Sequence, residues 1–307
     1  MSTAPSLPLL SAAETKKLLP VADLCQALSN AAAEYIAGRI ISPERQVLPL
    51  RGDAVLLSMP ATAHDIGIHK LVNVCPDNLK HGLPTIHGIV SAYDAVTGQP
   101  LLILDGPTVT AQRTSAISML AINSLYPGRP AAIALIGTGK QASGHLEAIA
   151  ALFPDIRVDV HGRELAGSAE FCRRHAALNL TLRPCHGRVA DDVDVVITLT
   201  TSKQPVYHEA ARSNRLLVGV GAFRPDMAEI GPAAIAGSQL FSDDPAGARH
   251  EAGDLIQAGV DWNTVRPLAE AIAGQYDANR PRLFKSVGTA AWDLAAARCA
   301  LAHWKAG

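Results

Sequence analysis

Apolar residues in the first third of the chain follow two different patterns. Ser11 and Glu14 have the spacing of a capping box, and residues 21–37 carry apolar side chains at helical spacing before Gly38, which predicts an early helix. Short β-rich runs between Gly, Pro and Asn-Asp turn signals then predict strands over residues 54–59, 66–74, 85–93 and 100–104. Residues 93–100 predict a hairpin connection. These elements predict an α+β unit on a mostly antiparallel or mixed sheet.

The rest of the chain alternates between strand and helix patterns. Residues 110–125 are helical in pattern, and a Pro-Gly-Arg-Pro break at 127–130 precedes a continuous apolar strand over residues 131–136. Further strands are predicted over residues 156–160, 180–182, 193–199, 216–220 and 239–242, with a helix over 164–177 among them. This alternation predicts a doubly wound parallel sheet, so the fold class is α/β. A final Ala-rich helix over residues 288–305 could return to the first domain, which the sequence does not decide.

The composition indicates which kind of ligand the protein binds. The chain has 307 residues, with 27 basic and 28 acidic side chains and a net charge of −1. A nearly neutral chain has no field that would concentrate nucleic acid or an anionic membrane, so a small-molecule partner is favoured. Hydrophobic residues make up 48% but aromatic residues only 4%, which is typical of helix-covered parallel sheets rich in Ala, Leu, Val and Ile.

The cysteines and the N-terminus favour the cytoplasm. Five scattered cysteines without CxxC spacing fit a reducing compartment. Residues 1–10 lack the basic and apolar regions of a signal peptide, and no later window has the length of a membrane span.

A dinucleotide-binding fingerprint follows the strand over residues 131–136. Gly137-Thr138-Gly139-Lys140-Gln141-Ala142 has the form G-x-G-x-x-A and opens a predicted helix. Gly137 allows a tight turn, Gly139 lets the backbone approach a pyrophosphate, and Ala142 permits close helix–strand packing. An incidental Gly-rich turn is the alternative, but the strand and helix around these residues favour a nicotinamide dinucleotide.

The end of the next strand indicates which dinucleotide. An NAD site usually has an acidic residue there, but this chain has His161-Gly162-Arg163. The guanidinium of Arg163 suits a 2′-phosphate, which favours NADPH, with NADH still possible because Asp159 and Glu164 are near in sequence. A solvated surface arginine is the alternative interpretation.

Three cations in the first part of the chain are candidates for substrate binding. Arg45, Lys70 and Arg113 lie in segments that are otherwise apolar or rich in threonine. A lysine inside a predicted strand is costly to bury without a partner, so taken alone Lys70 is better interpreted as pointing to solvent.

Ordered segments over nearly the whole chain resemble the ornithine cyclodeaminase and mu-crystallin family. They include Pro43-Glu44-Arg45, His69-Lys70-Leu71-Val72-Asn73, residues 105–116, the Gly137–Ala142 fingerprint, Thr198-Leu199-Thr200-Thr201-Ser202, residues 219–229 and Phe284-Lys285-Ser286-Val287-Gly288. The resemblance implies a homodimer, with residues 1–115 and 289–307 as substrate-binding and dimerisation domain and residues 116–288 as Rossmann domain.

The resemblance also implies roles for single residues. Arg45 and Arg113 would hold the substrate carboxylate, and Lys70 would sit beside the reacting carbon and nitrogen. Asp226 would have a structural or proton-relay role. The cofactor would contact Gly137 to Gln141 and Arg163, and also Thr110, Thr200, Thr201, Gly221 and Ser286.

One departure from the family pattern indicates the substrate. Ornithine cyclodeaminases of this family have an aspartate two residues before the proline of the Gly-Ala-x-x-Pro turn, where this chain has Phe223. The run Phe223-Arg224-Pro225-Asp226-Met227 is most similar to Δ1-pyrroline-2-carboxylate reductases. We therefore expect an enzyme that reduces a cyclic imino acid, Δ1-pyrroline-2-carboxylate or its six-membered homologue Δ1-piperideine-2-carboxylate, to L-proline or L-pipecolate.

Three alternatives stay open: ornithine cyclodeamination with bound NAD, an open-chain amino-acid or opine-type dehydrogenase, and an NADPH-dependent ligand binder without catalysis. No metal site is expected, because His64, His69, His81 and His87 match no zinc spacing. Asp243 and Asp244 are interpreted as a helix cap and loop pair.

Overall fold

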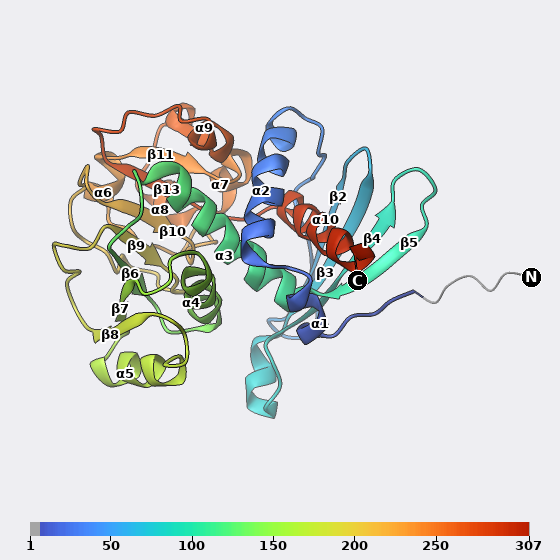
Figure 1. The fold of residues 1–307 in the computed structure, drawn as a ribbon, viewed down its shortest axis with the longest axis horizontal. Coiled ribbons are helices and arrows are strands. Elements are labelled where there is room, and N and C mark those ends of the chain that lie inside the picture. Colours follow the sequence, from blue (N-terminus) through green and yellow to red (C-terminus); the bar gives the residue numbers. More distant parts are fainter. Residues whose placement is uncertain (1–6, 307) are drawn as a thin grey trace, which may run out of the picture. The chain divides into compact units, whose positions relative to one another are not determined.

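A computed structural model describes residues 7–306 of the chain (Figure 1). The predicted absence of a signal peptide concerns residues 1–10, and of these residues 1–6 lie outside the described part. The chain divides into two compact units, one up to Arg113 together with Thr289 onward, the other from Thr114 to Gly288. From the sequence we expected the domain boundaries between residues 115 and 116 and between residues 288 and 289.

The first unit is built on an antiparallel sheet with strand order β1-β2-β3-β4-β5. Its helices and strands are α1 (Ala12–Lys17), α2 (Val21–Ile36), β1 (Gln46–Pro49), β2 (Val55–Thr62), β3 (Ile66–Val74), η1 (Pro76–His81), β4 (Ile86–Asp94), β5 (Pro100–Asp105) and α10 (Ala290–Ala306). The capping box of Ser11 and Glu14, the early helix, four strands and the β4–β5 hairpin were all predicted and are confirmed. The wholly exposed strand β1 and the helix η1 were not predicted.

One face of this sheet is covered by the C-terminal helix. In β3, alternate residues Ile66, Ile68, Lys70 and Val72 are buried. Helix α10 packs against β2, β3 and β4 and also contacts α2, as Figure 1 shows. The period of two along β3 therefore places Lys70 on the same buried face as its apolar neighbours.

Helix α3 (Gly106–Leu125) follows β5 and runs from the first unit into the second. The second unit holds β6 (Ala132–Ile136), α4 (Lys140–Leu152), β7 (Arg157–His161), α5 (Leu165–Arg174), β8 (Thr181–Cys185), β9 (Val195–Thr198), β10 (Leu216–Gly219), α6 (Pro232–Ala236), β11 (Gln239–Ser242), α7 (Pro245–Glu251), α8 (Gly253–Gln257), η2 (Trp262–Thr264), β12 (Val265–Pro267), α9 (Leu268–Ile272) and β13 (Arg282–Lys285).

The sheet of the second unit is parallel throughout. Its strand order is β12-β11-β13-β10-β9-β6-β7-β8, and every paired strand is parallel to its neighbour. From β6 the chain proceeds to β7 on one side and later returns to β9 on the other, so the strand order reverses between β6 and β9. The predicted Rossmann-type doubly wound fold is confirmed, and ligands of such sheets bind at the carboxyl ends of the strands where the order reverses.

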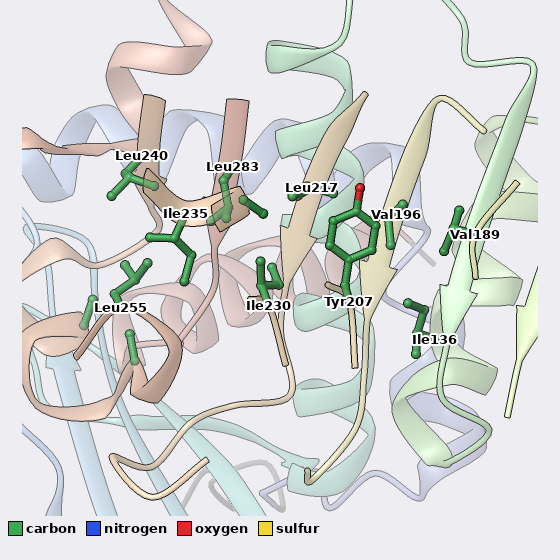
Figure 2. Packing of buried hydrophobic residues seen from close by; sticks show 14 of the residues in the cluster. Ile136, Val189, Val196, Tyr207, Leu217, Ile230, Ile235, Leu240, Leu255 and Leu283 are labelled. Atoms are coloured by element: carbon green, nitrogen blue, oxygen red, sulfur yellow. The ribbon is translucent and has the colours of Figure 1, made fainter. Parts of the chain in front are cut away.

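A dense apolar layer supports one face of this parallel sheet. Figure 2 shows side chains of several strands in this layer, among them Ile136, Val196, Leu217 and Leu283, together with Ile235 and Leu255 from the covering helices. Strands buried on both faces have continuous apolar sequences, which explains why β6, β9 and β10 read as unbroken hydrophobic runs. Within residues 7–306 no helix combines the length and hydrophobicity that a bilayer crossing requires.

Candidate active site

The turn between β6 and α4 has the geometry of a dinucleotide-binding loop. Gly137 has a φ of +126°, and a Cβ there would lie 2.7 Å from the carbonyl oxygen of Leu199. Gly139 is the N-cap of α4, and no heavy atom lies within 4 Å of where its Cβ would be. Ala142 is fully buried. Glycine is therefore required at 137 by conformation and packing, while Gly139 leaves free space in front of the helix N-terminus.

A groove of about 860 Å³ begins at this turn. It is lined by residues at the carboxyl ends of β6, β7 and β9, which include Gly137, Thr138, Gly139, Arg163, Thr200 and Thr201. Lys140 is exposed in the first turn of α4, and the next residue, Gln141, has a buried Oε1 without a hydrogen-bond partner in the described chain. Most of the residues expected at the cofactor thus share one groove within the second unit, and their arrangement fits a dinucleotide.

Two histidines of this groove were not singled out from the sequence. His161 and His186 line the same end as the exposed Arg163. Neither ring nitrogen of the buried His161 has a hydrogen bond of normal geometry within residues 7–306, although the Gly187 backbone is close enough to affect its pKa. Burial lowers the pKa of His161, so its ring is neutral near neutral pH.

Behind the groove, Glu229 organises the ends of two strands. Its buried carboxylate accepts hydrogen bonds from the amide and hydroxyl of Thr200, at 2.5 and 2.8 Å, and from the hydroxyl of Thr198 at 3.0 Å. It also accepts from the amides of Gly221 and Ala222, at 2.6 and 3.0 Å. A Cβ on Gly221 would lie 2.0 Å from the Thr200 carbonyl oxygen, so this approach requires glycine. Glu229 therefore fixes the groove wall at Thr200.

A second buried carboxylate links this wall to β13. Asp254 accepts a hydrogen bond from Lys285 Nζ at 2.8 Å and further hydrogen bonds from the amides of Glu229 and Ile230. Burial raises the pKa of Glu229, while the Lys285 ammonium opposes that shift. Sequence reasoning noted the segments that contain Glu229 and Lys285 but gave these residues no role.

Ser286 is held by Asp243, which directly follows β11. The Ser286 hydroxyl donates to Asp243 at 2.8 Å, and the amides of Val287 and Gly288 donate to the same carboxylate at 2.9 and 3.1 Å. Asp244 is the N-cap residue of α7. The interpretation of these aspartates as cap and loop residues thus describes their positions, and Asp243 has the additional role of fixing residues 286–288.

In the first unit, Lys70 is part of a buried ion cluster. Its Nζ donates to the two oxygens of Asp293 at 3.0 and 3.2 Å, and Arg113 Nε lies 3.7 Å from the same carboxylate. Lys70 and Arg113 are only 3% and 8% exposed, and Asp293 is fully buried. The interpretation that Lys70 points to solvent is therefore wrong, because α10 supplies a carboxylate that the local sequence around Lys70 does not contain.

Arg45 and Thr110 complete the expected residues of this unit. Arg45 is half-buried, and its charge is close enough to lower the pKa of Lys70. Thr110 lies in α3 and donates its hydroxyl to the carbonyl of Gly106 at 2.9 Å. Arg45 is therefore close enough to interact electrostatically with the cluster of Lys70 and Arg113. The carboxylate of that cluster, Asp293, was not among the residues expected from the sequence.

Asp226 lies in a different environment. It is exposed and pairs with Lys203 at 3.0 Å and with Arg224 at 3.1 Å. The hydrogen bond from Lys203 and the Arg224 charge lower the pKa of Asp226, so it stays ionised near neutral pH. Of its two expected roles, this placement favours the structural one. Within residues 7–306 no three His, Cys, Asp or Glu side chains are grouped as metal ligands.

These features define an α/β protein of the Rossmann class with a dinucleotide groove and a separate cluster of buried cations. The model of the ornithine cyclodeaminase/mu-crystallin family matches residues 8–307. The chain belongs to that family, as the ordered segments indicated.

Named relatives are similar over almost the whole chain. Delta(1)-pyrroline-2-carboxylate reductase 2 of Burkholderia ambifaria is 54% identical over 301 residues, which cover 98% of this chain and 97% of that protein. A Delta(1)-pyrroline-2-carboxylate/Delta(1)-piperideine-2-carboxylate reductase of Azospirillum brasilense is 53% identical over 311 residues and 100% of both chains. The structure of Thermococcus litoralis Delta(1)-pyrroline-2-carboxylate reductase in complex with NADH and L-proline has a TM-score of 0.84 at 24% identity, covers 98% of each chain and shares the fold.

Proposed function

We propose that this protein reduces the cyclic ketimines Δ1-pyrroline-2-carboxylate and Δ1-piperideine-2-carboxylate to L-proline and L-pipecolate with a reduced nicotinamide dinucleotide. One observation carries the proposal: two buried cations, Lys70 and Arg113, share the single buried carboxylate of Asp293. The excess positive charge suits a substrate with a carboxylate, and Arg113 Nε, 3.7 Å from Asp293, makes no hydrogen bond within residues 7–306. The names of the relatives at 54% and 53% identity point to the same substrates.

The chemistry follows from these charges. When bound, the reduced nicotinamide supplies a hydride for the carbon of the C=N bond. Arg113 and Arg45 hold the substrate carboxylate, which presents one face of the ring. Lys70, as an ammonium, hydrogen-bonds to or protonates the imine nitrogen and makes that carbon more electrophilic. The dinucleotide is held in the groove by the Gly137–Gln141 turn, Thr200 and Thr201. Ser286 directly follows β13, at the carboxyl end of another strand of the same parallel sheet.

We further propose NADPH as the preferred donor. Arg163 and His186 line one end of the groove, and Arg163 presents the guanidinium that a 2′-phosphate requires. The variant Arg163→Ala is expected to weaken NADPH binding at least about tenfold, the loss of one charge-assisted contact, and to change NADH binding far less. Equal losses for both dinucleotides would mean that Arg163 contacts a part that NADPH and NADH share, and no loss for either would make it a solvated surface residue.

We also propose a homodimer in a reducing compartment such as the cytoplasm. Leu48 of the edge strand β1 is 52% exposed, Ile89 of β4 is also exposed, and the strand register puts both on the sheet face opposite Lys70 and α10. Such apolar surface is typical of a subunit contact, and a second copy of the chain is the proposed occupant. Light scattering is expected to give twice the chain mass of 32.2 kDa. The five free cysteines fit a reducing compartment.

NADPH oxidation on addition of freshly made Δ1-pyrroline-2-carboxylate tests the function, with NADH and with ornithine plus NAD⁺ as parallel reactions. Fast turnover that prefers NADPH is the expected result. Proline and ammonia from ornithine, without ketimine turnover, would replace the proposal with cyclodeamination. A requirement for free ammonia or an amine with a 2-oxo acid would indicate an open-chain dehydrogenase, and binding without turnover would indicate a ligand-binding protein.

A further inference from the structure

We infer that Asp293 is a positioning residue for Lys70: it fixes the Lys70 ammonium in a buried apolar site and keeps it charged, so that Lys70 can deliver a proton to the substrate nitrogen. The inference rests on the proposed reduction of a cyclic ketimine and adds a residue that has no assigned role in it.

The geometry around Lys70 leaves Asp293 as its fixing group. Lys70 is paired across the sheet with Met59 of β2 and Val90 of β4, and both of these are buried. Within residues 7–306 both hydrogen bonds of Lys70 Nζ go to Asp293, at 3.0 and 3.2 Å. An ammonium has three N–H donors, so one remains for a ligand.

Asp293 is itself held rigidly. It lies in the first turn of α10, where the helix dipole favours a negative charge. The segment before the helix is tied to the loop ahead of β1 by a hydrogen bond of 2.7 Å between the hydroxyls of Thr289 and Ser42. The first turn of α10 therefore holds the Asp293 carboxylate at a fixed position beside Lys70 of β3.

The groups around Lys70 have opposing effects on its pKa. Burial lowers the pKa of Lys70 to about 8, Asp293 opposes that shift, and the nearby cations Arg113 and Arg45 add to it. Without the Asp293 charge, burial and two guanidinium groups would all favour the neutral amine. Asp293 is the one group among these that favours the ammonium at neutral pH.

The proton step balances as follows. The carbon of the C=N bond accepts a hydride from the reduced nicotinamide, and the π electrons of that bond become a lone pair on nitrogen. This nitrogen takes the proton from Lys70, which becomes a neutral amine and regains a proton from water before the next turnover. A neutral Lys70 at the start of the cycle could not donate, so the rate must fall as the pH rises through the pKa of Lys70.

The variant Asp293→Asn tests the inference, because the amide keeps the size of the side chain but not its charge. The pH profile of kcat/KM, which reports the enzyme before substrate binds, is measured with Δ1-pyrroline-2-carboxylate and NADPH. In the unaltered enzyme we expect the alkaline limb near a pKa of about 8. In Asp293→Asn the limb is expected to move down by about one pH unit or more, as for the loss of an opposite charge within hydrogen-bond distance. The substrate is the same in each reaction, so a difference in the limb reports the enzyme.

A matched control uses the same helix. Asp65 pairs with Arg298 of α10 at 2.6 and 2.9 Å, away from Lys70, so Asp65→Asn removes a carboxylate bound to α10 and is expected to leave the limb in place. An unmoved limb in Asp293→Asn, with rates lowered evenly at all pH values, would overturn the inference and leave Asp293 a structural role. If Asp293→Asn does not fold, Asp293→Glu serves instead: it keeps the charge but displaces the carboxylate, so kcat should fall while the alkaline limb stays near its original pH, and a limb lowered by about one pH unit would overturn the inference.

A readout without catalysis separates this inference from the proposed function. If the isolated enzyme turns over no ketimine, the proposed function fails. Urea unfolding at a series of pH values still tests whether Asp293 raises the pKa of Lys70. A lysine with a lowered pKa binds fewer protons in the folded state, so stability rises with pH from about 8 upward. In Asp293→Asn this rise should begin at a lower pH, and an unchanged onset would contradict the role of Asp293.

Discussion

The two units of this chain each bury a lysine–aspartate pair, and the charges around the two pairs are opposite. In the first unit, Lys70 and Arg113 share the single carboxylate of Asp293. In the second unit, Lys285 pairs with Asp254, and Glu229 adds another buried carboxylate. Both lysines and all three carboxylates are almost fully inaccessible.

The two buried clusters differ in whether the protein itself provides hydrogen-bond partners for all their charged groups. Asp254 and Glu229 accept hydrogen bonds from backbone amides at the ends of the strands, so their acceptors are occupied by the protein itself. In the first unit Arg113 Nε has no hydrogen-bond partner within residues 7–306, and one cation exceeds the carboxylates. A buried cluster that is incomplete without an external anion is suited to binding, whereas one completed by the backbone is suited to holding the fold.

Removal of the two lysines should therefore have different consequences. Lys70→Ala is expected to lower kcat for ketimine reduction by at least about 100-fold, the usual loss when a general acid is removed. NADPH binding, measured by fluorescence, should change little, because the groove lies in the other unit. Near-normal kcat would refute the role of Lys70, and a rise in KM alone would reduce it to a binding group.

In the second pair the expected loss is in stability. Asp254→Asn removes the carboxylate that accepts the hydrogen bond of Lys285 and leaves only Glu229 as a nearby buried counter-charge, and breaking a buried pair costs up to about 3–5 kcal/mol of unfolding free energy. Urea unfolding measures this loss. The control is Asp192→Asn, which breaks the exposed pair with Arg157 and should leave the urea midpoint almost unchanged. Equal midpoints for both variants would contradict a structural role for Asp254.

Much of this architecture could be predicted from the chain. The capping box of Ser11 and Glu14, the strand at 66–74 and the β6–turn–α4 fingerprint depend on residues close in sequence, and the structure has them at those places. Strand β1 was missed because all its residues are exposed and carry no alternation. The short elements α6 to α9, β12 and β13 have too few residues for a periodic pattern.

The site was harder to predict, because its ion pairs join distant residues. Lys70 and Asp293 are separated by 223 positions, and only the packing of α10 on β3 brings them together. Glu229 reaches Thr200 across 29 positions, through two strand ends of the parallel sheet. A buried charged residue in an apolar run signals that a partner exists, but the run does not contain the partner. The glycine fingerprint was predictable because its function lies in one continuous turn.

We expect Glu229, the carboxylate behind the groove, to affect both stability and cofactor binding. Glu229→Gln presents an amide N–H₂ to backbone donors, either at Thr200 or at Gly221 and Ala222, and each unsatisfied buried donor costs about 1–3 kcal/mol. We expect a lower urea midpoint and weaker NADPH binding. Thr198→Val is the control, since it removes one donor to Glu229 at a residue that does not line the groove. If Glu229→Gln binds NADPH normally, Glu229 does not position the groove wall.

The smallest expected change distinguishes charge from packing in the first unit. The triple variant Lys70→Met/Arg113→Leu/Asp293→Leu replaces all three buried charges by apolar side chains, and such replacements are neutral or stabilise by about 1–4 kcal/mol. Thermal unfolding should show an unchanged or higher Tm, and ketimine reduction should be lost. A clear fall in Tm would mean that the buried charges are retained for stability, as in the second unit.

Transfer of deuterium tests the central claim, reduction at the C=N carbon, most directly. Δ1-Pyrroline-2-carboxylate is incubated with NADPH deuterated at nicotinamide C4, on each face in turn, and the proline is analysed by mass spectrometry and chiral separation. We expect L-proline with one deuterium on its α-carbon from one of the two labelled cofactors, since in the proposed mechanism Arg113 and Arg45 hold the substrate carboxylate in a single orientation. Proline without deuterium from either cofactor, or no proline at all, would contradict direct reduction of the ketimine by this protein.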